Sequence, residues 1–466
     1  MIVILIFLYY YIFHIPHGGI KEERMNIKKE NLLNVKTILI LAIPVIFENI
    51  FQIFLGTNDT FFAGQLHDNA IAGIGVTNLI VNIFIAFYTA VSVGVTAVVA
   101  RNIGKKDYEQ ANKAVKQSII LGIVIGFLVG FISLIFCKPL LKLSGASDEI
   151  LEYAIPYYMI VAVPSIFLCL SLILSSCLRA AKDTKTPMIL SISSNILDII
   201  LNYIFIKLGW GIFGLGLSTT LSRCISVVIM IIKLNKGTSG IKLDLRNWHF
   251  EKEYFFTIAR IGLPAGIEKL VMRFGQLVYN GMIISIGTGV YVAHNIAGSI
   301  ESYSYIPAMG FGVATATLVG VSLGEKNPKQ AKKLTFLADG ISTICMLGIG
   351  IIFFIFAPQL AGIFTKTKEI KDMIISVLRL IALFQPFVAL TQILTSALQG
   401  AGDTKFPMYA TLIGIWVIRV GVGYILAVQL GFGLLGVWWG YALDLLLRSI
   451  LLLIRFLRGK WQTIVI

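Results

Sequence analysis

Apolar residues recur along the chain in segments of about 20 or more, separated by short polar stretches. A helix of about 20 apolar residues is long enough to cross a hydrocarbon core of about 30 Å, so each segment can span a bilayer. The pattern predicts twelve spans, six in each half of the chain. Their approximate bounds are 37–62, 70–100, 110–137, 150–178, 186–207, 212–234, 254–283, 291–322, 331–357, 371–399, 406–428 and 433–457.

The two halves repeat one another. The stretch LRAAKDTKTPM at 178–188 returns as LQGAGDTKFPM at 398–408, and we call the separation of Asp183 from Asp403 the repeat interval. Two other pairs of segments keep this interval: IPVIFE at 43–48 with LPAGIE at 263–268, and GKKDYEQA at 104–111 with GEKNPKQA at 324–331. Solenoid repeats are far shorter than this interval. We therefore predict an all-α membrane protein with two six-helix lobes related by internal duplication.

Composition and charge agree with a polytopic membrane protein and orient it. Apolar residues make up 57% of the chain and charged residues 14%, too few to solvate a globule of this length. Lys and Arg concentrate in the loops on one side of the predicted spans, which indicates a multi-pass plasma-membrane protein with both termini in the cytoplasm. Because each half has six spans, the lobes share one orientation. The net charge of +15 reflects this bias and attraction to anionic membrane lipid, and we expect no nucleic-acid binding.

The sequence predicts four parts of the chain. Residues 1–24 form an N-terminal extension whose apolar segment is too short to cross a bilayer, since 15 helical residues reach only about 22 Å. Met25 is followed by a stretch rich in lysine and is the favoured native start. The alternative is that the apolar N-terminal segment is a genuine interfacial segment. We predict an N-terminal lobe at 25–235, a cytoplasmic linker at 236–253 and a C-terminal lobe at 254–466.

Five polar residues lie within the predicted spans of the first half, all towards the outer side of the membrane. They are Asp59, Tyr157, Asp198, Asn202 and Thr219. Carboxylates are expensive inside a bilayer and usually face a cavity or a partner, although a boundary residue at the headgroups is the alternative for Asp59. Asp198 and Asn202 are one helical turn apart and share a face. Equal depth makes these residues a candidate group, but depth alone does not make them face one another.

Other acids within spans have structural explanations beside functional ones. Glu48 and Glu268 each follow a proline by four residues, so they suit either bonding of the freed backbone groups or gating and substrate contact. Gln52 is a further candidate for such contact. Asp444 and Arg448 are four residues apart, and we predict an internal ion pair.

Several motifs resemble those of the MATE (multidrug and toxic compound extrusion) transporters, over roughly residue 38 to the C-terminus. They are IPVIFENIFQIFLGTNDTFFAG, the repeated Asp-Thr-Lys-x-Pro loop and GIFGLGLSTTLSR. The resemblance implies two lobes around a central cleft and export of small cationic or amphiphilic substrates in exchange for H⁺ or Na⁺. In the DinF-like branch, the ion-coupling residues match Asp59, Tyr157 and Thr219, with Asp198 and Asn202 in the fifth span.

The fifth span departs from the family pattern. The family often has Asn-x-x-x-Asp there, whereas this chain has Asp198 and Asn202 in the opposite order. The second half repeats neither acid, because Tyr279 stands at the position of Asp59. Asp59 and Asp198 are metal ligands only if Na⁺ is the coupling ion.

Other functions are less favoured. No nucleophile, phosphate-loop or metal-ligand motif stands out, and the five cysteines fit reduced packing residues, so we expect neither an enzyme nor a cofactor. A lipid or oligosaccharide flippase of a related superfamily is the main alternative, but it would be expected to carry a strongly basic cavity. A membrane scaffold would need neither buried acids nor a duplication. We expect the transporter to act as a monomer.

Overall fold

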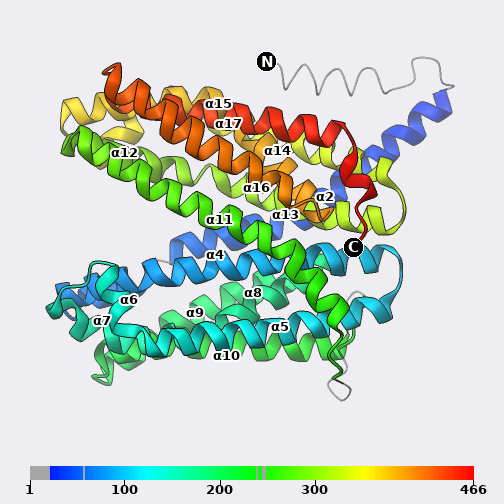
Figure 1. The fold of residues 1–466 in the computed structure, drawn as a ribbon, viewed down its shortest axis with the longest axis horizontal. Coiled ribbons are helices and arrows are strands. Elements are labelled where there is room, and N and C mark those ends of the chain that lie inside the picture. Colours follow the sequence, from blue (N-terminus) through cyan, green and yellow to red (C-terminus); the bar gives the residue numbers. More distant parts are fainter. Residues whose placement is uncertain (1–20, 56–57, 238–239, 244–247) are drawn as a thin grey trace. The chain divides into compact units, whose positions relative to one another are not determined.

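The computed structural model describes residues 21–55, 58–237, 240–243 and 248–466. Its regular structure in these ranges is built from helices, as Figure 1 shows. Most of the predicted N-terminal extension, residues 1–20, lies outside the described residues. Residues 21–24 open the helix α2 (Lys21–Leu55).

Contacts divide the chain into two compact units. The N-unit comprises Phe47–Leu270, and the C-unit comprises the described residues up to Ile46 together with Val271–Val465. This division differs from the predicted lobes because residues 25–46 group with the second half and residues 254–270 with the first. The lobe bounds drawn in chain order therefore stay a prediction.

Helix α2 begins as part of the C-unit. Its Asn34 accepts a hydrogen bond at Oδ1 from Nε2 of Gln330, at 3.0 Å. Ile38, Leu41 and Ala42 are buried in one apolar cluster with residues of α13 (Tyr305–Gly324), α14 (Pro328–Phe364) and α15 (Lys368–Gly400). Burial of this apolar face stabilises the first part of α2 on the C-unit, since each buried side chain contributes roughly 1.5–3 kcal/mol.

Helix α11 (Lys252–Ile286) begins in the same way on the N-unit. The Tyr254 hydroxyl donates to Gln110 Oε1 at 2.7 Å. A side chain at Gly262 would lie 3.0 Å from the carbonyl oxygen of Ala90 in α4 (Asp68–Gly104). Glycine at this position therefore lets α11 approach α4 this closely. The first parts of α2 and α11 thus each pack on the unit formed by the other half of the chain.

The helices match the twelve predicted spans. In the N-unit they are α3 (Asn58–Gly64), α4 (Asp68–Gly104), α5 (Tyr108–Ile135), α6 (Cys137–Leu143), α7 (Asp148–Val161), α8 (Ser165–Ala180), α9 (Lys185–Lys207) and α10 (Gly211–Lys236). In the C-unit they are α12 (Thr288–Ser302), α13 (Tyr305–Gly324), α14 (Pro328–Phe364), α15 (Lys368–Gly400), α16 (Lys405–Leu412), the π-helices η1 (Ile413–Val422) and η2 (Ile425–Gln429), α17 (Gly433–Leu457) and the short 3₁₀ helix η3 (Lys460–Thr463).

Ten described helices are long and apolar enough to cross a membrane, and α7 with α8 makes an eleventh span bent by 48°. Helix α11 has 35 residues but carries six charged side chains, and it supplies the remaining predicted span. The all-α membrane architecture predicted from the sequence is therefore confirmed.

Equivalent loops of the two halves have the same backbone geometry. Lys106 and Lys326, one repeat interval apart, both have positive φ, at 59° and 56°. The side chains of Asp107 and Asn327 then cap the next helix, each accepting from the backbone N–H three residues on, at 3.1 and 3.0 Å. This conformation is uncommon for lysine, so its recurrence supports the duplication.

The repeated Asp-Thr-Lys loops also match. Asp183 N–H donates to Leu178 O at 2.9 Å, and Asp403 N–H donates to Leu398 O at 2.8 Å. Both bonds close the end of a helix in the same way. The duplication therefore extends to the hydrogen bonds of the turns.

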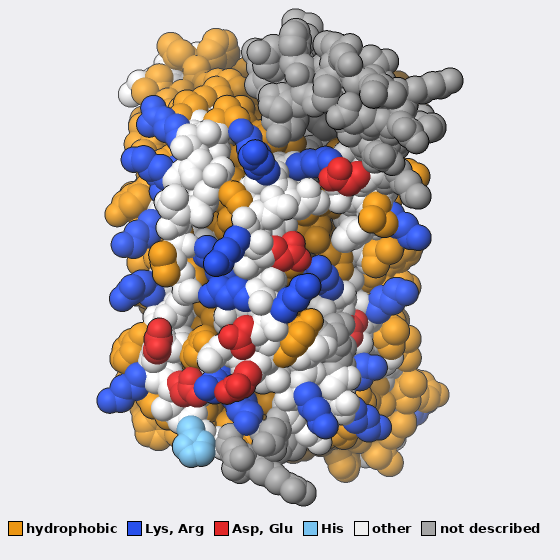
Figure 2. All heavy atoms as spheres, turned by 90° about the vertical axis from the view of Figure 1, so that its right-hand side faces the viewer, with side chains coloured by type: hydrophobic (Ala, Val, Ile, Leu, Met, Phe, Trp, Pro, Cys, Tyr) orange, Lys and Arg blue, Asp and Glu red, His pale blue; other side chains and the backbone are white. Residues whose placement is uncertain are grey.

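Lys and Arg side chains are spread over the face shown in Figure 2, among fewer acidic ones. This distribution agrees with the predicted cytoplasmic side, although the orientation of the termini stays a prediction.

Candidate ion-coupling site

Asp59, at the start of α3, is the centre of a partly buried polar cluster in the N-unit. Its Oδ2 accepts hydrogen bonds from the Tyr157 hydroxyl at 2.7 Å and the Thr219 hydroxyl at 3.0 Å. Its Oδ1 accepts a third bond from Asn202 Nδ2 at 2.9 Å. The donors belong to α7, α10 and α9, so four separate helices meet at one carboxylate.

Asp198 is the second carboxylate of this cluster. Its Oδ2 accepts from Asn58 Nδ2 at 3.5 Å, a long hydrogen bond. Its Oδ1 is buried and has no hydrogen-bond partner among the described residues. A buried carboxylate oxygen without a donor is costly, so Asp198 is the group in the cluster that gains most from a bound proton or cation.

Asn202 contributes the third donor to Asp59. It lies one turn beyond Asp198 on α9 and is fully buried. While Nδ2 donates to Asp59, Oδ1 accepts a hydrogen bond from the Ser218 hydroxyl. Both ends of the amide are therefore satisfied, which fixes its orientation towards Asp59.

Glycines of the sequence motifs allow the helices to come this close. A side chain at Gly216, in the GIFGLGLSTTLSR segment of α10, would lie 3.4 Å from the Tyr157 carbonyl oxygen. A side chain at Gly73 of α4 would lie 3.0 Å from the backbone nitrogen of Ala154. Close packing of α4 and α10 on α7 holds the Tyr157 hydroxyl against Asp59, where it is 1% exposed.

The structure brings all five predicted ion-coupling residues into this single cluster, whereas their roles stay a prediction. Ser218 was missed by the sequence analysis. Its signal was present, because it directly precedes Thr219 in the same motif.

Glu48 has a charged partner that the sequence analysis did not predict. Both its carboxylate oxygens accept from Arg179 Nη2, at 2.8 and 2.7 Å, and the Glu48 side chain is buried. Gln52 is exposed and donates to the Ser191 hydroxyl at 3.2 Å. Glu268 is buried. The roles of Glu48, Gln52 and Glu268, whether structural or in gating and substrate contact, stay a prediction.

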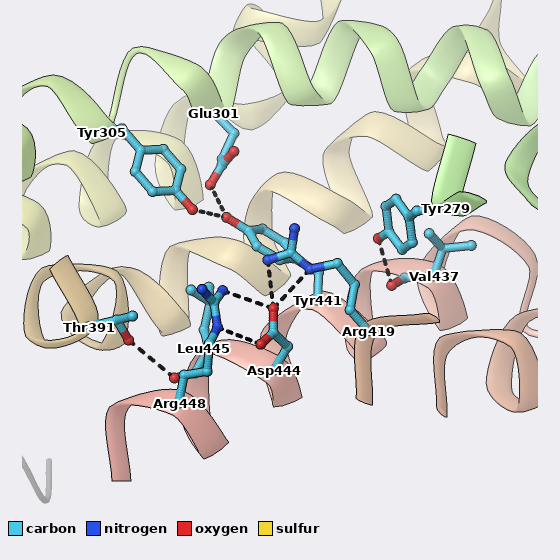
Figure 3. A network of polar contacts seen from close by, with 10 residues as sticks. All are labelled: Tyr279, Glu301, Tyr305, Thr391, Arg419, Val437, Tyr441, Asp444, Leu445 and Arg448. Carbon is cyan, nitrogen blue, oxygen red and sulfur yellow. Dashed lines mark hydrogen bonds and ion pairs between the residues drawn. The ribbon is translucent and has the colours of Figure 1, made fainter. Parts of the chain in front are cut away.

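The C-unit has different chemistry at the corresponding places. The hydroxyl of Tyr279, the counterpart of Asp59, donates to the carbonyl of Val437 at 2.9 Å. Arg448 Nε pairs with Asp444 Oδ1 at 2.6 Å, which confirms the predicted ion pair. Arg419 Nη2 is a second partner of Asp444 at 2.6 Å, which the sequence analysis missed (Figure 3).

Across the described ranges, no group of three or more His, Cys, Asp or Glu side chains is arranged to hold a metal ion. The cluster around Asp59 instead offers two carboxylates together with hydroxyl and amide oxygens. Oxygen ligands of this kind suit a hard cation as well as a proton.

Comparison with known proteins identifies the family. The MatE family model matches residues 44–204 and 264–425, two segments whose starts are one repeat interval apart. The chain belongs to the MATE family. It is therefore a multi-span membrane transporter and not an enzyme, and MATE transporters need no cofactor.

Similar proteins cover the chain almost end to end. The probable multidrug resistance protein NorM of Thermotoga maritima is 31% identical over 455 residues, which are 95% of each chain. The uncharacterized transporter YisQ of Bacillus subtilis is 26% identical, over 90% of this chain and 94% of its own. The assignment to the DinF-like branch stays a prediction.

Solved MATE structures have the same fold. A crystal structure of MATE in the bent conformation superposes with a TM-score of 0.85 at 26% identity, covering 92% of this chain and 95% of its own. The outward-facing conformation of a multidrug resistance MATE family transporter gives 0.85 at 25% identity, over 93% and 97%.

Proposed function

We propose that this MATE protein exports small cationic or amphiphilic molecules in exchange for H⁺ or Na⁺, and that Asp59, with Asp198 and Asn202 as partners, forms the site of the coupling ion. The similarity to the probable multidrug resistance protein of T. maritima supports the export of drugs. The observation that carries the ion assignment is the convergence of Tyr157, Asn202 and Thr219 on the Asp59 carboxylate, beside a second acid.

The chemistry of the site suits one exchangeable cation. Like charges brought together in a low-dielectric environment disfavour joint ionisation, and burial penalises each charge further. Asp59 has three donors that stabilise its charge, whereas Asp198 has an oxygen without one. One proton or one Na⁺ bound between the acids relieves the repulsion and satisfies that oxygen.

Coupling then requires that ion occupancy changes the conformation. An ion shifts an equilibrium only by its difference in affinity for the two states, and the substrate must prefer the opposite state. Donors from α7, α9 and α10 converge on α3, so any change in the packing of these helices alters the hydration of Asp59. The unit therefore contains a means of linking ion release to helix movement.

The test is efflux of a fluorescent cation such as ethidium from cells that express each variant at matched levels in the membrane. Asp59→Asn should abolish efflux because it keeps the shape of the side chain but removes its charge. Tyr279→Phe, at the counterpart position in the C-unit, is the matched control and should retain most of the activity. Undiminished efflux from Asp59→Asn would refute the site, and equal losses in both variants would refute the asymmetry between the halves.

The setting of this activity is part of the same proposal. We expect a monomer in the plasma membrane, with lipid around its spans and both termini in the cytoplasm. Cysteine accessibility to a membrane-impermeant reagent, with single cysteines placed near each terminus, tests the orientation.

A further inference from the structure

Glu301 of α12 is a buried acid that the duplication does not predict. One repeat interval earlier in the chain, its counterpart in the first half is Val81. Glu301 is 7% exposed. Its Oε1 accepts a hydrogen bond from the Tyr441 hydroxyl at 2.7 Å. The Tyr441 hydroxyl in turn is hydrogen-bonded to the Tyr305 hydroxyl, as Figure 3 shows.

A charged triad adjoins this row of hydroxyl groups. Arg419 places its guanidinium 4.3 Å from the centre of the Tyr441 ring. The same guanidinium bonds Asp444 Oδ2 through Nε at 2.9 Å, and Arg448 bonds Asp444 through Nε and Nη2 at 2.6 and 2.9 Å. The triad has two positive charges and one negative. An ionised Glu301 would make the whole cluster neutral, whereas a protonated Glu301 leaves it at +1.

These surroundings place opposing demands on the Glu301 carboxyl group. Burial disfavours the charged form of any carboxyl group, while a nearby guanidinium favours it. The hydrogen bonds fit either form. An ionised Glu301 accepts from Tyr441, which accepts from Tyr305; a protonated Glu301 donates to Tyr441, which donates to Tyr305. The two arrangements differ by one proton, and no other bond has to break.

The polar neighbours of Glu301 come from α13, α17 and η1. Tyr305 belongs to α13; Tyr441, Asp444 and Arg448 belong to α17, and Arg419 to η1. His294, on α12 itself, faces Tyr279 and Trp438 instead. Helices α14 and α15 also contact α12, but their charged side chains form none of the hydrogen bonds or ion pairs described for this cluster.

Arg419 lies on the unusual part of span eleven. Residues 413–422 form a π-helix, whereas the corresponding fifth span is an α-helix throughout Lys185–Lys207. π-Helices are rare and are often found at functional sites. A change in the charge that Arg419 experiences therefore acts on a segment whose hydrogen bonding already departs from the regular helix.

We propose that Glu301 is a proton-binding group of the C-unit, separate from Asp59, and that its charge state sets how strongly Arg419 is held by Asp444. On protonation, Glu301 takes one H⁺ from solution and keeps it. The protonated carboxyl group donates a hydrogen bond to the Tyr441 oxygen, and the Tyr441 hydroxyl turns to donate to Tyr305. With Glu301 neutral, Arg419 is attracted by Asp444 alone. With Glu301 ionised, a second negative charge beyond the Tyr441 ring also attracts the Arg419 guanidinium. A role of this proton in transport rests on the antiport proposed above, but its binding does not.

The test is infrared difference spectroscopy of the full-length protein in lipid vesicles during a pH titration, which detects the C=O stretch of protonated carboxyl groups. The wild type should show a component that is lost as the pH rises. Glu301→Gln should lack that component, while Asp59→Asn should retain it and lose a different one. An unchanged set of components in Glu301→Gln would overturn the proposal. Loss of efflux in Asp59→Asn is measured separately, so failure of the proposed function is distinguishable.

Tyr441→Phe provides a second test that does not depend on folding of the Gln variant. This change removes the donor to Glu301 Oε1 and leaves the acid in place. The component assigned to Glu301 should persist, with a shifted frequency and a titration midpoint at higher pH. Both forms of Glu301 lose a hydrogen bond in this variant, but the bond to the ionised carboxylate is the stronger one. A spectrum and midpoint identical to the wild type would contradict the hydrogen bonding of Glu301 to the Tyr441 hydroxyl.

Discussion

Replacement of Asp444 by Asn should destabilise the protein far more than replacement of either arginine that it binds. Asp444 is fully buried, and its two carboxylate oxygens hold both Arg419 and Arg448. Asn keeps the size of the side chain but cannot balance their charge. Two guanidinium groups, each about nine-tenths buried, would then lie together without the carboxylate that bonds both of them.

The magnitude follows from the burial of the pair. Removal of one partner from a buried ion pair typically costs about 3–5 kcal/mol, because it leaves an uncompensated charge. Arg448→Met removes two hydrogen bonds but leaves Asp444 and Arg419 as a balanced pair, so we expect a loss of about 1–2 kcal/mol. If about 1 kcal/mol shifts Tm by 2–4 °C for a unit of this size, Asp444→Asn should lower Tm by roughly 6–20 °C.

Thermal unfolding in detergent, followed by tryptophan fluorescence, measures this difference. Trp438 and Trp461 lie in the C-unit and are 2% and 0% exposed, so both report on its unfolding. The reasoning would be refuted if Arg448→Met lowered Tm as much as Asp444→Asn does.

Three further predictions concern the N-unit. Tyr157→Phe removes one of three donors to Asp59, so the ion concentration for half-maximal transport should shift by up to about tenfold while efflux persists. Asp198→Asn should reduce ethidium efflux severely at matched expression, since the second carboxylate is lost, and a wild-type rate would contradict its role. Arg179→Gln should lower Tm by several degrees, and Glu48→Gln added to it should recover part of that loss, because the unpaired buried acid is then neutral.

The fold could be predicted from the sequence because its causes are local. The length of each apolar segment decides that it spans the membrane, and the constant repeat interval reveals the duplication. The same argument applies to the turns, where Asp107 and Asn327 occupy capping positions that their residue types favour.

The contacts within the site depend on how the helices pack, which no local pattern specifies. Depth placed Asp59 and Tyr157 at the same level, but only the rotation of α3 and α7 makes them face each other. The pairing of Asp444 with Arg448 follows from spacing within one helix, whereas its pairing with Arg419 depends on how η1 packs against α17. The division of α2 between the two units could not be predicted for a related reason. The apolar face of a helix shows that it will be buried, but not against which other helices.

The central claim is that the Asp59 cluster couples transport to an ion gradient. The most direct measurement is substrate flux in proteoliposomes under an imposed Na⁺ gradient or an imposed pH gradient, each applied alone. One of the two gradients should drive wild-type protein to concentrate substrate, by up to about tenfold for each tenfold ion gradient if one ion is exchanged. Asp59→Asn should equilibrate substrate without concentrating it under either gradient. Gradient-driven accumulation by Asp59→Asn at the wild-type level would contradict the account.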